Sequence, residues 1–176
     1  VNPTHLFGLF SVFTPDVISG VNMYQANIPA KYGGRIASVV DIKVKSPYTD
    51  QFKLEGGIGV ISSKLSLSTP IIKDKLMLLA GGRIGFTDFL FTLLIPRLKN
   101  TKANFTDSTV KLLYLLNERN QFTYTHFFSH DFYQLDLISS IENIVSSSNQ
   151  FDFGTSNHTL RWLHGFQNDT NLVGTL

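Results

Sequence analysis

The sequence contains no cysteine among its 176 residues, so disulfide bonds and thiol chemistry are excluded. It is also poor in charge, because Asp, Glu, Lys and Arg make up 16% of the residues, against roughly 25% in ordinary soluble domains. The net charge of +2 gives no electrostatic footprint for nucleic acid, and we expect no such partner. No uncharged apolar stretch of about 18 residues occurs, which argues against a membrane-spanning helix.

Aromatic residues are the feature that the sequence has in excess. Phenylalanine occurs 15 times and tyrosine 6 times. Aromatic richness without a long apolar run is typical of strands that have one apolar face. The chain begins at Val1 without a signal peptide, so we expect a mature, trimmed or partial polypeptide.

The chain is organised around residues 28–45, which read IPAKYGGRIASVVDIKVK. Pro29 to Gly34 predicts a sharp turn, since paired glycines permit backbone dihedrals that a side chain would forbid. Ile36 to Lys45 predicts a strand, because β-branched residues dominate it and charges alternate toward its end. Upstream, Thr14-Pro15-Asp16 predicts a helix start with a hydroxyl cap, and Val21 to Tyr24 a short strand.

This order of features resembles the last part of the plug domain of TonB-dependent outer-membrane receptors, most closely their Bacteroidetes branch. The resemblance runs from Phe7 to Lys45. In that family a Pro-Asp helix start leads to a strand, a Pro-Ala-x-Tyr-Gly-Gly-Arg turn and a strand ending near Asp-x-x-x-Lys. The matching motif residues are Pro29, Tyr32, Gly33, Gly34, Arg35, Asp41 and Lys45.

The resemblance implies an all-β dominated fold, in which the C-terminal part of an α+β plug domain precedes a segment of an antiparallel transmembrane β-barrel. Residues 1–45 would belong to the plug, 46–50 to a linker, and 51–176 to the first strands of the barrel. The implied function is energy-coupled uptake of a large nutrient such as a siderophore, an oligosaccharide or a peptide. The implied location is the outer membrane of a Gram-negative bacterium, in contact with its lipid. The implied energising partner is the TonB–ExbB–ExbD complex, through segments absent here, and whether a surface lipoprotein covers the barrel stays open.

Residues after the linker alternate between apolar and polar side chains, which predicts strands with two different faces. On one of them Val110, Leu112 and Tyr114 face one way, and Thr109 and Lys111 face the other. About seven strands are predicted: Leu54 to Ile61, Lys64 to Thr69, Leu76 to Phe89, Ser108 to Leu116, Gln121 to Phe132, His158 to Phe166 and Asn171 onward.

The connections between these strands alternate in length. Pro70 to Lys75, Asn117 to Asn120 and Gln167 to Thr170 are short, whereas Thr92 to Thr106 and Gln134 to Phe151 are long. Outer-membrane barrels have short periplasmic turns and longer outer loops. Plugged transporters of this kind use about 22 strands, so seven strands predict a fragment.

Three charged residues are predicted to face the barrel lumen. Arg83 and Lys111 are expected to pair with carboxylates of the plug, and Glu55 is the expected partner of Arg35. Gly81-Gly82-Arg83 has two readings, an anion-binding nest or small residues where the barrel wall meets the plug, and the second is favoured.

His126, His130 and Asp131 form the best metal or catalytic candidate. On a strand, at about 3.3 Å per residue, the two histidines lie roughly 13 Å apart, which is too far for one zinc ion. We therefore expect no metal site. His5, His158 and His164 have no spacing that supports one.

The sequence offers no chemical step. It has no Gly-x-Ser-x-Gly, no phosphate loop and no His-Glu-x-x-His, so neither an enzyme nor a cofactor is expected. Two other functions stay open: a passive outer-membrane porin or structural barrel, and a soluble all-β domain that binds carbohydrate through its aromatic residues.

Overall fold

The computed structural model of the chain describes residues 4–33, 38–88, 93, 101–136, 148–167 and 170–176. The fold is all-β, and all of its described strand pairs are antiparallel. The predicted fold class is thereby confirmed at this level. Within the described ranges no helix has the length and apolar character needed to cross a membrane.

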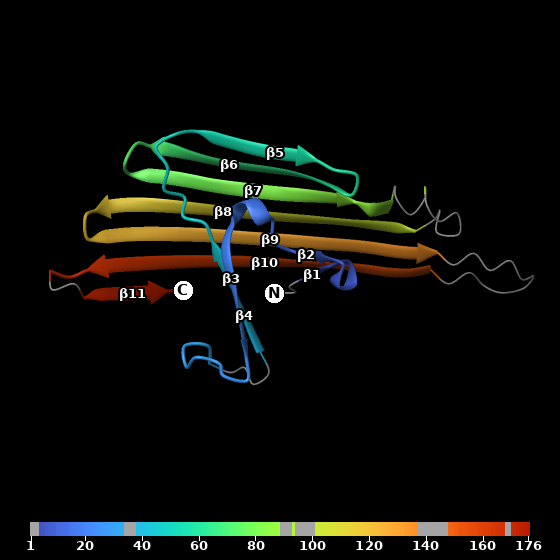
Figure 1. Cartoon of the computed structure of the whole chain (residues 1–176), viewed down its shortest axis with the longest axis horizontal. Helices are drawn as coiled ribbons and strands as arrows, with labels where there is room; N and C mark the ends of the chain where they lie inside the picture. Colours follow the sequence, from blue (N-terminus) through green and yellow to red (C-terminus); the bar gives the residue numbers. More distant parts are fainter. Residues whose placement is uncertain (1–3, 34–37, 89–92, 94–100, 137–147, 168–169) are drawn as a thin grey trace, which may run out of the picture.

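The main body of the molecule is a seven-stranded sheet in which every strand pairs with its neighbours in sequence (Figure 1). This up-and-down order results from reversals that join consecutive antiparallel strands. The strands are β5 (Lys53–Ile58), β6 (Ser62–Ile72), β7 (Leu76–Phe86), β8 (Lys102–Asn117), β9 (Asn120–Asp136), β10 (Ser148–Gly165) and β11 (Asn171–Thr175).

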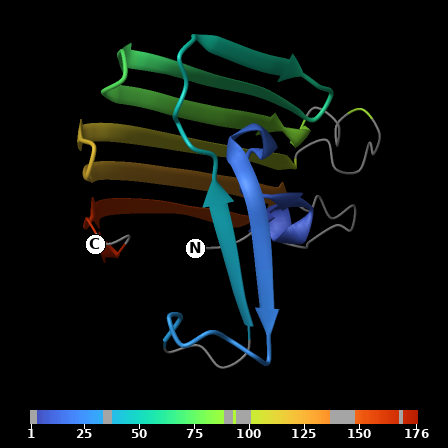
Figure 2. The ribbon, with the colours of Figure 1, turned by 60° about the vertical axis from the view of Figure 1, so that its left-hand side comes forward.

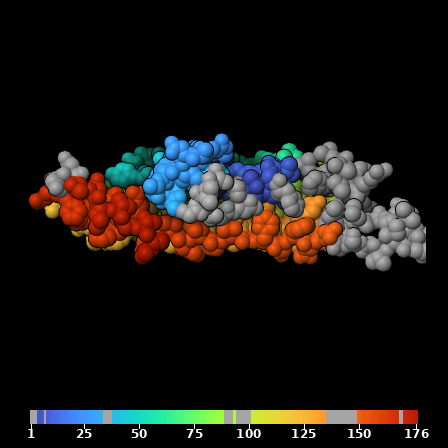
Figure 3. All heavy atoms as spheres, turned by 90° about the horizontal axis from the view of Figure 1, so that it is seen from below, coloured from blue at the N-terminus to red at the C-terminus, as the bar shows by residue number. Residues whose placement is uncertain are grey.

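An N-terminal segment, residues 4–45, lies against one face of this sheet and contains two small two-stranded ladders. Its β3–β4 hairpin runs across the strands of the sheet rather than along them (Figures 1 and 2). In Figure 3 the blue atoms of the segment form a layer on one side of the strands. The elements are β1 (Thr4–His5), η1 (Leu6–Gly8), β2 (Phe10–Ser11), η2 (Pro15–Val17), β3 (Ile18–Gln25) and β4 (Ser38–Val44).

The two faces of the sheet differ as the alternation predicts. We call the face that the N-terminal segment covers the inner face; on β8 and β9 it carries the odd-numbered residues. Its buried apolar side chains form the core, and these are Met77, Leu79, Ala103, Phe105, Leu113 and Phe127. Thr109 is buried on the same face, whereas Leu116 and Leu160, on the outer face, are about half exposed.

The short helix begins at Pro15 as predicted, but Thr14 does not cap it. The Thr14 side chain makes no hydrogen bond to the helix backbone and instead donates to the Asp107 carboxylate on β8. The helix is a single 3-10 turn that ends at Val17, and β3 follows at once. A tertiary partner has therefore displaced the local capping bond.

Strand boundaries differ from the prediction mainly next to the long connections. The β8 strand begins at Lys102 rather than Ser108, and β10 at Ser148 rather than His158. In these added parts the outer face is polar, with residues such as Asn104, Thr106 and Ser156, and the apolar residues of the alternation lie on the inner face instead, namely Ala103, Phe105, Phe151 and Phe153. Pairing with β9 continues there regardless, since the ladder depends on backbone groups.

One reversal is also shifted. The β5–β6 turn is closed by the Gly59 N–H, which donates to the Ser62 carbonyl over 2.9 Å, so the chain reverses at residues 59–61 rather than at Ser62-Ser63. The turns after β6 and β8 lie within their predicted ranges.

Candidate functional site

A buried polar network joins the N-terminal segment to β8 and β9. His5 is completely buried, with its Nδ1 atom 2.8 Å from Asp131 Oδ2 and its Nε2 atom 3.3 Å from Asp107 Oδ2. Both ring nitrogens thus face carboxylate oxygens. A carboxylate only accepts hydrogen bonds, so a doubly protonated ring, which donates at both nitrogens, satisfies this geometry.

Asp107 holds three parts of the molecule together. Besides His5, its carboxylate accepts hydrogen bonds from the Thr14 hydroxyl and from Arg83 Nε, the latter at 2.8 Å. Arg83 also donates through Nη2 to the Ser11 carbonyl. Since Asp107 is 2% exposed, these donors replace the water that the carboxylate would otherwise bind.

Asp131 fixes the backbone beside His5. Its Oδ1 atom accepts from the Leu6 N–H at 3.0 Å. Leu6 has a φ of 46°, a left-handed conformation that costs energy for a leucine. The Asp131 carboxylate therefore contacts both the side chain of His5 and the backbone of the strained residue that follows it.

The ring of Phe105 forms the apolar side of the network. His5 stacks on it with ring centroids 4.5 Å apart, and Phe10 stacks with centroids 5.3 Å apart. The Arg83 guanidinium lies 5.0 Å from the ring centroid. Gly85 makes room for this ring, because a Cβ there would come within 2.0 Å of it.

The end of the hairpin is held at a second place on the sheet. Lys111 Nζ on β8 donates to the Val44 and Lys45 carbonyls, at 3.1 and 3.2 Å. The Lys45 N–H donates to the Val17 carbonyl at 2.8 Å. Lys64 on β6 and Asp16 form an ion pair of 2.9 Å that is partly exposed.

The predicted turn motif closes on itself. The Tyr32 N–H donates to the Pro29 carbonyl at 3.0 Å, and the Tyr32 ring lies 5.6 Å from that of Tyr24. The Asp41 carboxylate, as hydrogen-bond acceptor for the Tyr32 hydroxyl, raises the pKa of Tyr32 above its usual value. The hydrogen bond between the Lys31 and Tyr32 side chains likewise raises the pKa of Lys31. Gly33 lies in the turn.

Two motif residues, Gly34 and Arg35, lie outside the described residues. The predicted pairing of Arg35 with Glu55 therefore stays a prediction; Glu55 is exposed on β5.

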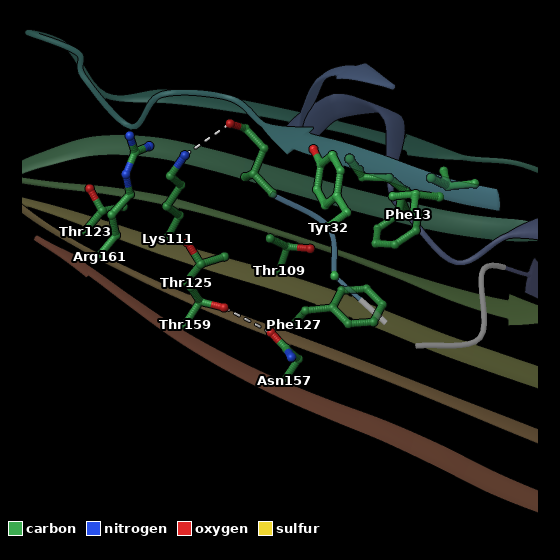
Figure 4. Close-up of a pocket in the computed structure, with 15 residues that line it drawn as sticks. Phe13, Tyr32, Thr109, Lys111, Thr123, Thr125, Phe127, Asn157, Thr159 and Arg161 are labelled. Atoms are coloured by element: carbon green, nitrogen blue, oxygen red, sulfur yellow. Dashed lines mark hydrogen bonds between the residues drawn. The ribbon is translucent and has the colours of Figure 1, made fainter. Parts of the chain in front are cut away.

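A cavity of about 850 Å³ lies between the hairpin and the inner face of the sheet (Figure 4). Its hairpin side is mostly apolar and includes Val40, Ile42 and Val44. Its sheet side is polar and carries threonines, Asn157 and two cations. These sheet residues are Thr109, Lys111, Thr123, Thr125, Asn157, Thr159 and Arg161.

The predicted charged residues of the inner face find partners other than plug carboxylates. Arg83 pairs with Asp107, which belongs to the neighbouring strand of the same sheet, and reaches the N-terminal segment through a backbone carbonyl. Lys111 likewise contacts backbone carbonyls. Gly81 lies in regular strand β7 and faces Val17, which matches small residues at a contact and not an anion nest.

The predicted histidine candidates do not gather. His126 and His130 lie on the outer face of β9, where they contact Ser156 and Asp152 respectively. Asp131 lies on the inner face with His5. Among the residues that the structure describes, no group of three or more potential metal ligands occurs.

Sequence reasoning missed Asp107, and it named His5 and Asp131 without bringing them together. Asp107 and Asp131 occupy odd positions of β8 and β9, so the alternation that places Thr109 and Lys111 inward also places these acids inward. A buried carboxylate needs a hydrogen-bonding or charged partner, so the alternation already indicated that Asp107 and Asp131 have one. The sequence does not identify that partner, because His5 lies 102 residues before Asp107 and 126 residues before Asp131.

Comparisons with known proteins give no relative: no protein-family model, no curated protein and no solved structure matches the chain.

Proposed function

We propose that the chain is part of a TonB-dependent outer-membrane receptor that imports a nutrient. In this proposal the N-terminal segment is the end of the plug, residues 46–50 are the linker, and the seven-stranded sheet is part of the barrel wall. The observation that supports it best is the N-terminal segment lying on the inner face, held there by the buried network of His5, Asp107 and Asp131. A plug that fills a barrel requires this kind of contact.

The outer face supports a lipid-facing role near the short turns. Leu112, Tyr124 and Leu160 occupy one register row across β8, β9 and β10, and Tyr114, Phe122 and Trp162 occupy the next. Aromatic and aliphatic side chains in adjacent rows are typical of the outward band of membrane barrels and of the aromatic girdle at its border. The inner face, by contrast, is polar where it lines the cavity beside the hairpin.

The proposal is tested on the native polypeptide that carries this sequence. Membranes of the source cells are first washed with sodium carbonate and then extracted with detergent, and the intact denatured mass of the extracted polypeptide is measured. The extracted protein is then mixed with the purified periplasmic domain of TonB, and complex formation is measured by sedimentation.

We expect extraction only by detergent, a mass several times 19.7 kDa and a complex with TonB. Release by carbonate would instead favour the soluble carbohydrate-binding domain. A detergent-extracted protein that does not bind TonB would favour the passive porin, which has no need of the N-terminal segment.

A further inference from the structure

We infer that the cavity beside β4 binds an anionic ligand rich in hydroxyl groups, such as an acidic oligosaccharide or a sugar phosphate. This inference rests on the proposed function, because such a ligand would be the transported nutrient. It concerns the charge and chemical class of that nutrient, which the fold alone does not determine.

The charges of the cavity are all of one sign. Lys111 and Arg161 line it, and in the part of the chain that the structure describes no carboxylate does. Figure 4 shows both cationic side chains rising from the sheet toward the hairpin. Two cations that share a concave site without a carboxylate attract an anion.

Both cations have donors to spare. Lys111 Nζ has three N–H groups, and the Val44 and Lys45 carbonyls take two of them. The described residues provide no hydrogen-bond partner for the Arg161 guanidinium, whose planar donors match a carboxylate or phosphate. A bound anion would therefore not have to displace an existing ion pair.

Hydroxyl and amide groups surround the two cations. Thr123 and Thr125 on β9 and Thr159 on β10 belong to the cavity wall, together with Asn157. The Thr159 hydroxyl donates to Asn157 Oδ1 at 3.2 Å, which leaves the Asn157 amide N–H groups for a ligand. Such groups both donate and accept, as sugar hydroxyls require.

The remaining wall suits the less polar faces of a sugar. Phe13, Tyr32 and Phe127 contribute aromatic rings, and β4 contributes aliphatic side chains. At about 850 Å³ the cavity is within the range of roughly 300–1,000 Å³ that is usual for small-ligand sites. It is nearer to the short turns than to the long connections, since Thr123 and Arg161 are close to the turn ends of β9 and β10.

The test measures binding by equilibrium dialysis on the full, detergent-extracted protein. Two matched pairs of probes each compare an anion with a neutral counterpart: trigalacturonate and its trimethyl ester, and glucose 1-phosphate and glucose. The variants are Lys111→Gln and Arg161→Gln. Arg119→Gln, in the exposed β8–β9 turn outside the cavity, removes the same charge and is the matched control.

We expect at least one anionic probe to bind ten times or more tightly than its neutral partner. Each cavity variant should then lose about tenfold in affinity for that probe, because it removes a charge-assisted hydrogen bond, and the control should not. The inference is overturned if no pair shows a preference for the anion, or if both cavity variants bind like the parent protein.

Dialysis requires no energised membrane, so its result is independent of the proposed function. A protein that binds TonB but prefers neutral probes would refute only the anionic ligand. A protein that binds the anion in this cavity but not TonB would refute only energised import.

Discussion

The Nδ1 atom of His5 lies 2.8 Å from Oδ2 of Asp131, although 126 residues separate them in sequence. The contact is fully buried and joins the first strand of the N-terminal segment to the middle of the sheet. It is the most distant in sequence of the hydrogen bonds described above, so it depends on the completed fold.

His5→Phe should release the N-terminal segment. The substitution keeps an aromatic ring against Phe105 but removes both donors, which leaves the buried Asp131 with the Leu6 N–H as its one donor among the described residues. Breaking a buried charge pair by removing one partner costs about 3–5 kcal/mol. Hydrogen exchange of residues 4–17 should therefore become faster by two orders of magnitude or more.

His158→Phe is the matched control for this experiment, because His158 is exposed on the outer face. It should leave the exchange of residues 4–17 unchanged. Equal protection in His5→Phe and the parent protein would show that the network does not hold the segment.

Gly81→Ala should force the segment away from β7. A Cβ at residue 81 would lie 2.4 Å from Val17 Cγ1, so one of the two must move. Overpacking of this kind costs about 1–3 kcal/mol. The measurement is the denaturant midpoint for loss of segment protection, and Gly57→Ala, whose Cβ would make an ordinary 3.6 Å contact with Lys64, is the control.

Val17→Ala supplies a second check on the same contact. It removes the methyl group that a residue 81 side chain would meet, so the double variant should be more stable than the sum of the two single effects predicts. Strict additivity would mean that Gly81 and Val17 are not in contact.

Asp41→Asn should lower the pKa of Tyr32 toward the usual value of about 10. The Asp41 carboxylate is the largest cause of the raised pKa in the parent protein. A pKa raised by folding contributes stability below about pH 10 that is lost as the pH rises through the folded value. Tyrosinate absorbance, with Tyr32→Phe to identify the Tyr32 transition, measures the shift.

Asp50→Asn, in the linker, is the control for charge alone and should leave the Tyr32 titration in place. An unchanged Tyr32 titration in Asp41→Asn would contradict the contact between these two motif residues.

Asp16→Asn should have little effect. Its ion pair with Lys64 is 2.9 Å long, but the Lys64 side chain is 41% exposed. Exposed pairs contribute about 0–1 kcal/mol, because water screens them and the side chains lose entropy. The denaturant midpoint should thus shift far less than in Gly81→Ala; an equal shift would mean that Asp16 has a further structural role.

Periodicity predicted the fold better than it predicted the site. The alternation around Val110 and Lys111 assigned the two faces of β8 correctly, because side-chain direction in a strand depends only on residue number. Turn chemistry placed Tyr32 near Pro29 for the same local reason. Both predictions use interactions between residues that are close in sequence.

The buried network could not be found in this way. Thr14 looks like a helix cap because the sequence shows only its neighbours, and Asp107 becomes its acceptor only after the segment has packed on the sheet. Arg83 faces the N-terminal segment in the structure, and its partner on β8 depends on the β7–β8 register, in which residue 83 lies opposite 107.

The position of His5 at the start of the segment determines which contacts break first when the chain is pulled from its N-terminal side. A pull on the chain upstream of His5 reaches β8 and β9 first, through the side chains of Asp107 and Asp131. The backbone ladder of the β3–β4 hairpin and the Lys111 contacts are loaded only after those side-chain bonds have parted. The segment would therefore detach from the sheet in sequence order, and the force required is that of its strongest single attachment rather than the sum of all of them.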